Sequence, residues 1–240
     1  MFATDLLSVA VVVPATAVIV AVFVVLWRAH RSRREGGIAL ASGVGLAAWL
    51  VAEIALARKG SFVQAAGAAG PPGVGINLVV VLIALAFFLA ISPSLRSLLS
   101  RQSSLVRLHL WRFEGALFLI LMAQSRLPAI FALPAGIGDV LVAATAPWVA
   151  RTADAPLGKR RAILWNVFGL TDLVVAIALG VMTNPGPLHV FNTVPNSAAM
   201  AHFPMALIPT FFVPLAMTLH VISLWQLLRG SWARPTGGRA

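Results

Sequence analysis

The chain has 240 residues, of which 60% are hydrophobic and only 10% are charged, and its mean hydropathy is +0.93. A soluble domain carries roughly a quarter charged residues, so this composition is typical of a polytopic membrane protein. The absence of cysteine excludes disulfides, thiol chemistry and thiolate metal sites. The formal net charge of +11 would suit nucleic acid, but the basic residues follow a membrane topology, so we expect no nucleic-acid partner.

Seven apolar stretches are long enough to cross a bilayer, which takes a helix of about 20 residues. The first begins after Asp5 and has no basic residue before it, which argues against a cleaved signal peptide. We therefore expect one transmembrane domain over residues 1–240, an all-α bundle of seven transmembrane helices. These helices are predicted near residues 6–27, 37–57, 75–95, 105–124, 128–150, 163–183 and 203–228.

Lysine and arginine are distributed unevenly between the connections. Loops 28–36, 96–107 and 151–162 together with the C-terminal tail carry fourteen of them, whereas the connections on the other side carry three. An excess of positive charge marks the cytoplasmic side of a membrane protein. The sequence therefore predicts an outside N-terminus and a cytoplasmic C-terminus, with the basic loops against anionic lipid headgroups.

Two of the apolar stretches, in residues 128–183, each carry one aspartate near the middle. At about 1.5 Å per residue, Asp139 and Asp172 lie within roughly 3 Å of the same depth. A charge at that depth costs roughly 2.5–3.5 kcal/mol on insertion scales and normally faces the protein interior. Small residues at helical spacing around both should allow close helix approach, so we expect the two carboxyl groups to approach each other, directly or through water.

The two stretches also resemble each other in sequence. Residues 135–143 (AGIGDVLVA) align with residues 168–176 (FGLTDLVVA), and a glycine precedes each aspartate by three positions. Because consecutive spans run antiparallel, such a pair would form an inverted repeat with a site near the midplane of the membrane. The alternative is a chance recurrence of Gly, Asp, Val and Ala in an apolar chain.

Other ionisable residues also fall inside predicted spans, namely Glu53, Arg112, Glu114 and His220. Arg112 and Glu114 are two positions apart and point to nearly opposite helix faces, so they should not pair with each other. Arg112 is instead the expected partner of an aspartate, because its guanidinium matches a carboxylate. Four acids share this one buried arginine, so some of them must be protonated, reach water or bind a cation.

These residues form a candidate site for a proton, a cation or another substrate. Its predicted members are Asp139, Asp172, Arg112, Glu114, Asn166 and His220. The leading hypothesis is a small proton- or cation-coupled transporter in which the aspartates bind and Arg112 tunes them. The alternative is a membrane sensor or assembly partner whose polar network only fixes helix packing, and an intramembrane enzyme comes third.

Several other chemistries find little support in the sequence. No Walker loop, GxSxG, GxGxxG or HExxH motif occurs, and the last predicted span has no lysine for a retinal Schiff base. His109 and His220 are the possible axial pair of a haem, although His109 is expected near the membrane interface. We therefore expect no cofactor and no metal, and the sequence favours a protein without enzymatic activity.

The last predicted span contains Pro204, Pro209 and Pro214. Each proline removes a backbone hydrogen bond, so we expect this helix to be bent near Pro209 or Pro214. Such a break would suit a hinge, although proline is also common in ordinary membrane helices.

The segments LPAGIGD, FGLTDLVVA and HFPMALIPTFFVPLAMTLH resemble a group of uncharacterised bacterial multi-pass membrane proteins. The resemblance covers residues 112–228. It implies a location in the bacterial plasma (inner) membrane and brings no established activity with it.

The predicted orientation can be tested at the C-terminus. A reporter that is active only in the cytoplasm should give a strong signal when fused to Ala240, because the basic loops are expected to stay inside. A fusion that is well expressed but silent would contradict the orientation or the helix count.

Overall fold

The structure, a computed structural model, describes residues 2–64 and 72–229, and these residues form helices and their connections. The helical elements follow one another along the chain as α1 (Phe2–Ala29), α2 (Arg33–Arg58), α3 (Gly73–Ile91), α4 (Pro93–Leu98), α5 (Gln102–Arg107), the 3-10 helix η1 (Leu110–Gly115), α6 (Ala116–Ala123), α7 (Ala129–Ala150), the 3-10 helix η2 (Pro156–Gly158), α8 (Lys159–Thr183), the 3-10 helix η3 (Ala198–Ala201), the π-helix η4 (Ile208–Phe212) and α9 (Val213–Arg229). The all-α prediction is confirmed for this part of the chain.

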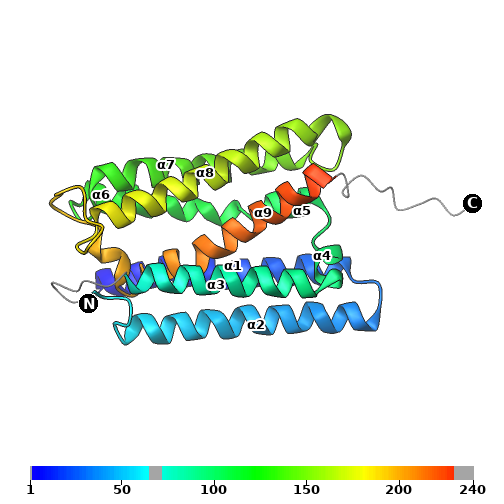
Figure 1. The fold of residues 1–240 in the computed structure, drawn as a ribbon, viewed down its shortest axis with the longest axis horizontal. Helices are drawn as coiled ribbons and strands as arrows, with labels where there is room; N and C mark the ends of the chain where they lie inside the picture. Colours follow the sequence, from blue (N-terminus) through cyan, green and yellow to red (C-terminus); the bar gives the residue numbers. More distant parts are fainter. Residues whose placement is uncertain (1, 65–71, 230–240) are drawn as a thin grey trace, which may run out of the picture.

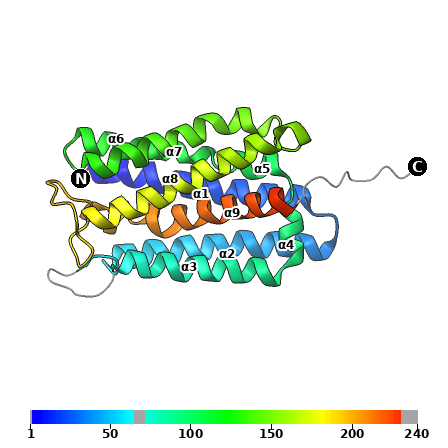
Figure 2. The same ribbon diagram turned by 45° about the horizontal axis from the view of Figure 1, so that its top comes forward.

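Long apolar helices run side by side in an elongated bundle (Figures 1 and 2). Among the described residues, six helical segments are long and apolar enough to cross a membrane, and the chain is therefore a multi-pass membrane protein by helix length and composition. These segments cover residues 6–29, 33–58, 73–91, 129–150, 156–183 and 208–229.

The predicted helix at 105–124 is not one continuous helix. It is divided into α5, η1 and α6, and it falls outside the six candidate spans. Gly115, where η1 meets α6, packs closely against α7: a Cβ on Gly115 would lie 2.3 Å from Cβ of Asp139, so the backbone there runs directly against the aspartate. α5 and α6 nevertheless lie at opposite ends of the bundle, so the broken segment still runs along its length (Figures 1 and 2).

The connections that carry most of the basic residues lie together at one end of the bundle (Figure 1). This basic end holds the α1–α2 and α7–α8 connections, the α4–α5 segment and the last turn of α9. The first turns of α1, the α6–α7 connection and residues 184–207 lie at the other end, called here the far end. The arrangement agrees with the grouping of loops that the charge distribution predicts, while the orientation in a membrane stays a prediction.

Several helix boundaries differ from the predicted ones because local capping decides them. α2 begins at Arg33, four residues before the apolar run, since the hydroxyl of Ser32 accepts a hydrogen bond from the backbone N–H of Glu35 at 3.2 Å. The Glu35 carboxylate in turn accepts a hydrogen bond from the backbone N–H of Arg31, the residue before the N-cap, at 2.7 Å. α3 ends at Ile91, earlier than predicted, because Pro93 starts the short helix α4.

The last helix is irregular where its prolines are. The predicted span began at residue 203, but the helix begins with the π-helical η4, which contains Pro209, and continues as the α-helix α9. A π-helical turn accommodates the missing N–H of a proline by shifting the hydrogen-bond pattern. The structure thus has an irregular turn at Pro209, whereas Pro214 lies in the α-helix α9, and the predicted bend of this helix stays a prediction.

Glu53, one of the four acids inside the predicted spans, is bound away from Arg112. Its buried carboxyl group accepts hydrogen bonds from Nε1 of Trp49 at 2.9 Å and from Nδ2 of Asn77 at 2.6 Å. Since Asn77 belongs to α3, this contact joins α2 to α3. Glu53 therefore has a structural role that needs no ligand.

Asn77→Ala should destabilise the fold, because it leaves one oxygen of the buried Glu53 carboxyl group without its donor. The expected loss is about 1–3 kcal/mol of unfolding free energy, seen as a lower melting temperature in detergent. Val80→Ala on the exposed face of the same helix is the matched control and should change the melting temperature much less. Equal melting temperatures for the two variants would contradict a stabilising role for the Glu53 contact.

Candidate functional site

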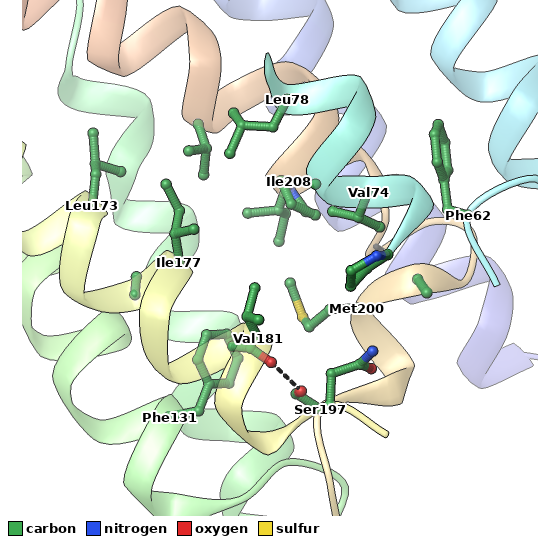
Figure 3. Close-up of a pocket in the computed structure, with 18 of the residues that line it drawn as sticks. Phe62, Val74, Leu78, Phe131, Leu173, Ile177, Val181, Ser197, Met200 and Ile208 are labelled. Carbon is green, nitrogen blue, oxygen red and sulfur yellow. Dashed lines mark hydrogen bonds between the residues drawn. The ribbon is translucent and has the colours of Figure 1, made fainter. Parts of the chain in front are cut away.

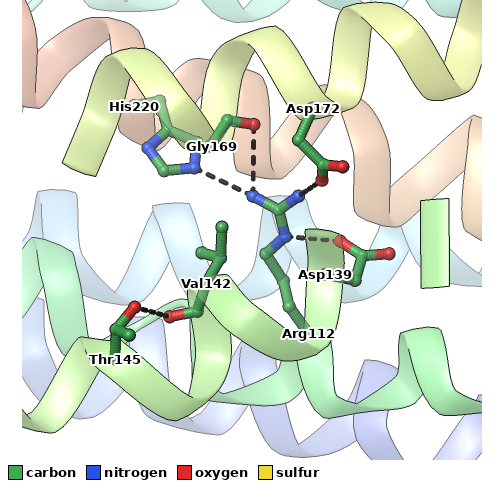
Figure 4. Close-up of polar contacts among 7 residues, drawn as sticks. All are labelled: Arg112, Asp139, Val142, Thr145, Gly169, Asp172 and His220. Atoms are coloured by element: carbon green, nitrogen blue, oxygen red, sulfur yellow. Dashed lines mark hydrogen bonds and ion pairs between the residues drawn. The ribbon is translucent and has the colours of Figure 1, made fainter. Parts of the chain in front are cut away.

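Arg112 lies at the centre of the polar contacts between the helices (Figure 4). Its side chain is 0% exposed, and its Nε donates to Oδ1 of Asp139 and its Nη2 to Oδ2 of Asp172, each at 2.5 Å. The expectation that Arg112 lies within ion-pair distance of an aspartate is confirmed for both aspartates. One guanidinium group stands between the carboxyl groups of α7 and α8, so the aspartates are joined through Arg112 rather than by direct contact.

The close packing around Arg112 depends on glycine at two positions. A Cβ on Gly138 would lie 1.7 Å from Oδ1 of Asp172, and a Cβ on Gly169 would lie 2.5 Å from Nε2 of His220. Any larger side chain at either position would occupy the space of a group that binds Arg112. The sequences GIGD and FGLTD therefore provide both the carboxylates and the space that they need.

His220 of α9 is the third side chain that contacts Arg112. Nη1 of Arg112 lies 3.0 Å from Nε2 of His220 and 3.4 Å from the carbonyl oxygen of Gly169. Because a guanidinium can only donate, Nε2 must accept, and the imidazole carries its proton on Nδ1. That Nδ1–H donates to Oδ1 of Asn166 at 2.9 Å.

From Asn166 the hydrogen bonds continue to the basic end. Nδ2 of Asn166 donates to Oγ of Ser223 at 2.8 Å, and the Ser223 hydroxyl donates to Oε1 of Gln102 at 2.6 Å. Nε2 of Gln102 then donates to Oε1 of Gln226 at 2.8 Å, and Nε2 of Gln226 donates to the carbonyl oxygen of Leu99 at 3.0 Å. We call this series the polar chain; its members are Arg112, His220, Asn166, Ser223, Gln102 and Gln226.

Glu114 and His109 lie close by but outside the polar chain. Glu114 is 9% exposed, and neither of its carboxyl oxygens has a hydrogen-bond partner among the described residues. His109 is fully buried, and its ring centroid lies 4.0 Å from that of His220. Imidazoles that contact each other in this way leave no room for a porphyrin between them. In residues 2–64 and 72–229, no group of three or more His, Asp or Glu side chains is placed to hold a metal ion.

A cavity of about 110 Å³ is lined by Asp139 and by residues near the far end of the bundle. Figure 3 shows part of its wall. Asn184 and Ser197, near the far end, also line it, and Asp139 supplies the carboxyl group of the lining. The rest of the wall is mostly apolar and comes from segments distant in sequence, including Phe62, Leu78, Phe131, Leu173, Ile177 and Ile208. Asp139 thus lines the cavity while its carboxyl group binds Arg112, and its side chain is 14% exposed.

The structure brings five of the six predicted site residues into one hydrogen-bonded group and leaves Glu114 outside it. The sequence analysis missed Ser223, Gln226 and Gln102. A signal for the first two exists, because His220, Ser223 and Gln226 follow each other at three-residue spacing on one helix face. Gln102 falls in a stretch that was assigned to a loop, and no pattern in the sequence singles it out.

A bundle of long apolar helices around a buried polar cluster is a multi-pass membrane protein. Its family is DUF8737, a domain of unknown function that matches residues 71–228, and the chain belongs to it. The match contains the resemblance found at 112–228 and begins earlier, at residue 71, so that it takes in α3. No curated protein and no solved structure shows a significant match.

Gly138→Ala should weaken the site and the fold together, because the new methyl group and Oδ1 of Asp172 cannot occupy the same space. Over-packing of this kind costs about 1–3 kcal/mol, measured as a lower melting temperature in detergent. Gly45→Ala is the matched control, since a Cβ there has no neighbour within 4 Å. The control should melt at the same or a slightly higher temperature, because alanine favours a helix over glycine. A Gly138→Ala variant as stable as the control would contradict the close approach of the two helices.

Proposed function

We propose that this protein is a small proton- or cation-coupled transporter whose binding group is the pair Asp139 and Asp172. The observation that carries the proposal is the sharing of one buried guanidinium by two carboxyl groups, one of which faces a cavity. Carboxyl groups inside a membrane protein commonly mark the path of an ion or a proton.

The charges around Arg112 support this proposal. Arg112 contributes one positive charge, and the two aspartates contribute two negative charges when both are ionised. His220 accepts from Arg112 and is therefore neutral in this arrangement, and Glu114 is buried without a donor. A bound proton or cation would remove the surplus negative charge, which is costly to keep in a low-dielectric site.

Access to the site differs between the two ends of the bundle, as alternating access requires. The cavity extends from Asp139 toward the far end, whereas the polar chain fills the space toward the basic end with buried, mutually bonded side chains. Pro209 of the π-helical η4 lines the cavity, so a shift of this irregular turn would change the cavity wall. We propose that the structure represents the state open to the far end.

The orientation belongs to the same proposal. α1 begins at the far end and α9 ends at the basic end, which requires an odd number of passages through the bundle (Figure 1). With six long candidate spans, the broken segment α5–η1–α6 would be the seventh passage. The basic end would face the cytoplasm of a bacterium and the anionic headgroups of its plasma membrane.

One observation favours the alternative function, a sensor or assembly partner that does not transport. Every link of the polar chain pairs a donor with an acceptor, as expected for a network that only fixes the packing of α5, α8 and α9. The two functions differ in what the aspartates do, and this difference can be measured.

Asp139→Asn and Asp172→Asn should each abolish pH-dependent uptake in proteoliposomes that contain a pH-sensitive dye. Asparagine cannot take up a proton at neutral pH, so coupled uptake should be lost. It keeps the shape and most hydrogen bonds of aspartate, so the melting temperature should change little. Asp154→Asn, outside the candidate site, is the matched control and should transport normally. If the network is only structural, both Asn variants should behave like the control, and Asp139→Ala should lower the melting temperature. Full uptake with Asn at both positions would refute the transport proposal.

A further inference from the structure

One oxygen atom of the Asp139 carboxyl group remains free for a ligand. Oδ1 accepts from Arg112 at 2.5 Å, whereas no described residue donates to Oδ2. The side chain lines the cavity described above, and Figure 4 shows its second oxygen turned away from the guanidinium group. A ligand in the cavity would therefore meet a carboxylate oxygen that is already fixed in direction.

The rest of the wall is suited to hydrocarbon. Phe118 and Phe131 line the cavity as a tilted aromatic pair with ring centroids 5.4 Å apart, and Leu78, Leu173 and Ile177 add aliphatic surface. Aromatic faces also attract cations. The cavity thus combines an apolar wall with a single acidic group, and this combination suits a molecule with one cationic end.

We infer that the cavity binds a small alkylammonium ion, with the ammonium group on Oδ2 of Asp139 and the alkyl group against the apolar wall. An N–H donor matches the free carboxylate oxygen. The positive charge of the ligand offsets the surplus negative charge that remains when one arginine pairs with two ionised aspartates. An anion would add to that surplus. A neutral apolar molecule would leave Oδ2 without a partner.

The size of the cavity limits the ligand. A protein cavity of about 150 Å³ is known to take up benzene, so the volume of about 110 Å³ found here accommodates an amine with about four carbon atoms. The inference names the substrate class for the proposed transporter, and it rests on that proposal only for the role of Asp139 as the binding group.

The test is a calorimetric titration of the purified full-length protein in detergent with n-butylammonium chloride at neutral pH. Saturable binding is expected, and 1-butanol, which has the same alkyl chain without the charge, should bind at least about tenfold more weakly. Asp139→Asn should lower the affinity for n-butylammonium by about tenfold or more, because it removes a charge-assisted hydrogen bond. Equal affinity for the alcohol, or unchanged amine binding by Asp139→Asn, would overturn the inference.

A second pair of variants tests the cavity without altering Asp139. Ala176→Leu should block binding of n-butylammonium, because Ala176 lines the cavity, whereas Val175→Leu, outside the lining, should bind normally. Full binding by Ala176→Leu would also overturn the inference. Dye-loaded proteoliposomes separate the inferred ligand from the proposed function. Proton uptake that depends on Asp139, without any binding of n-butylammonium, would refute only the amine ligand. Binding of n-butylammonium without coupled proton movement would refute only the coupled transport.

Discussion

The structure depends above all on the pairing of the Arg112 guanidinium deep inside an apolar bundle. A fully buried arginine is destabilising unless its charge and its donors are satisfied, and here the partners come from three different helices, α7, α8 and α9. The position of one side chain is thus coupled to the relative positions of all three helices. Removal of one partner would leave an incompletely paired charge in the interior.

The same interaction makes the interior asymmetric. Toward the basic end, the guanidinium continues into amide, hydroxyl and imidazole groups that bond to one another and to the backbone carbonyls of Ala162 and Leu99. Amide groups do not exchange protons readily, so this side is better suited to holding His220 in one tautomer than to conducting ions. Toward the far end, Asp139 instead faces a cavity. Under the proposed function, a proton or cation would reach the aspartates from the far end, and its release on the other side would require the polar chain to break.

Sequence patterns predicted the centre of the site and missed its surroundings, for identifiable reasons. The pairing of Asp139 and Asp172 with Arg112 follows from helix geometry and from the rarity of charge in apolar spans. The close packing of Gly115 against Asp139 is a contact between distant segments, and such contacts leave no periodic signal in the sequence. The cavity wall likewise joins α3, α8 and η4, which are far apart in the sequence. The count of seven membrane passages and the inverted repeat stay predictions.

The extent of the family match bears on where the function lies. Residues 71–228 contain Arg112, both aspartates and the whole polar chain, whereas α1 and α2 lie outside the match. The ionisable residue that α2 buries, Glu53, is bound to Trp49 and Asn77 and has no contact with Arg112 among the described interactions. The cavity is also lined almost entirely from within the match, and Phe62 is the one described lining residue outside it. The candidate site is therefore built from the matched part of the chain. The first two helices contribute packing, and Phe62, in the connection after α2, adds one aromatic side chain to the cavity wall.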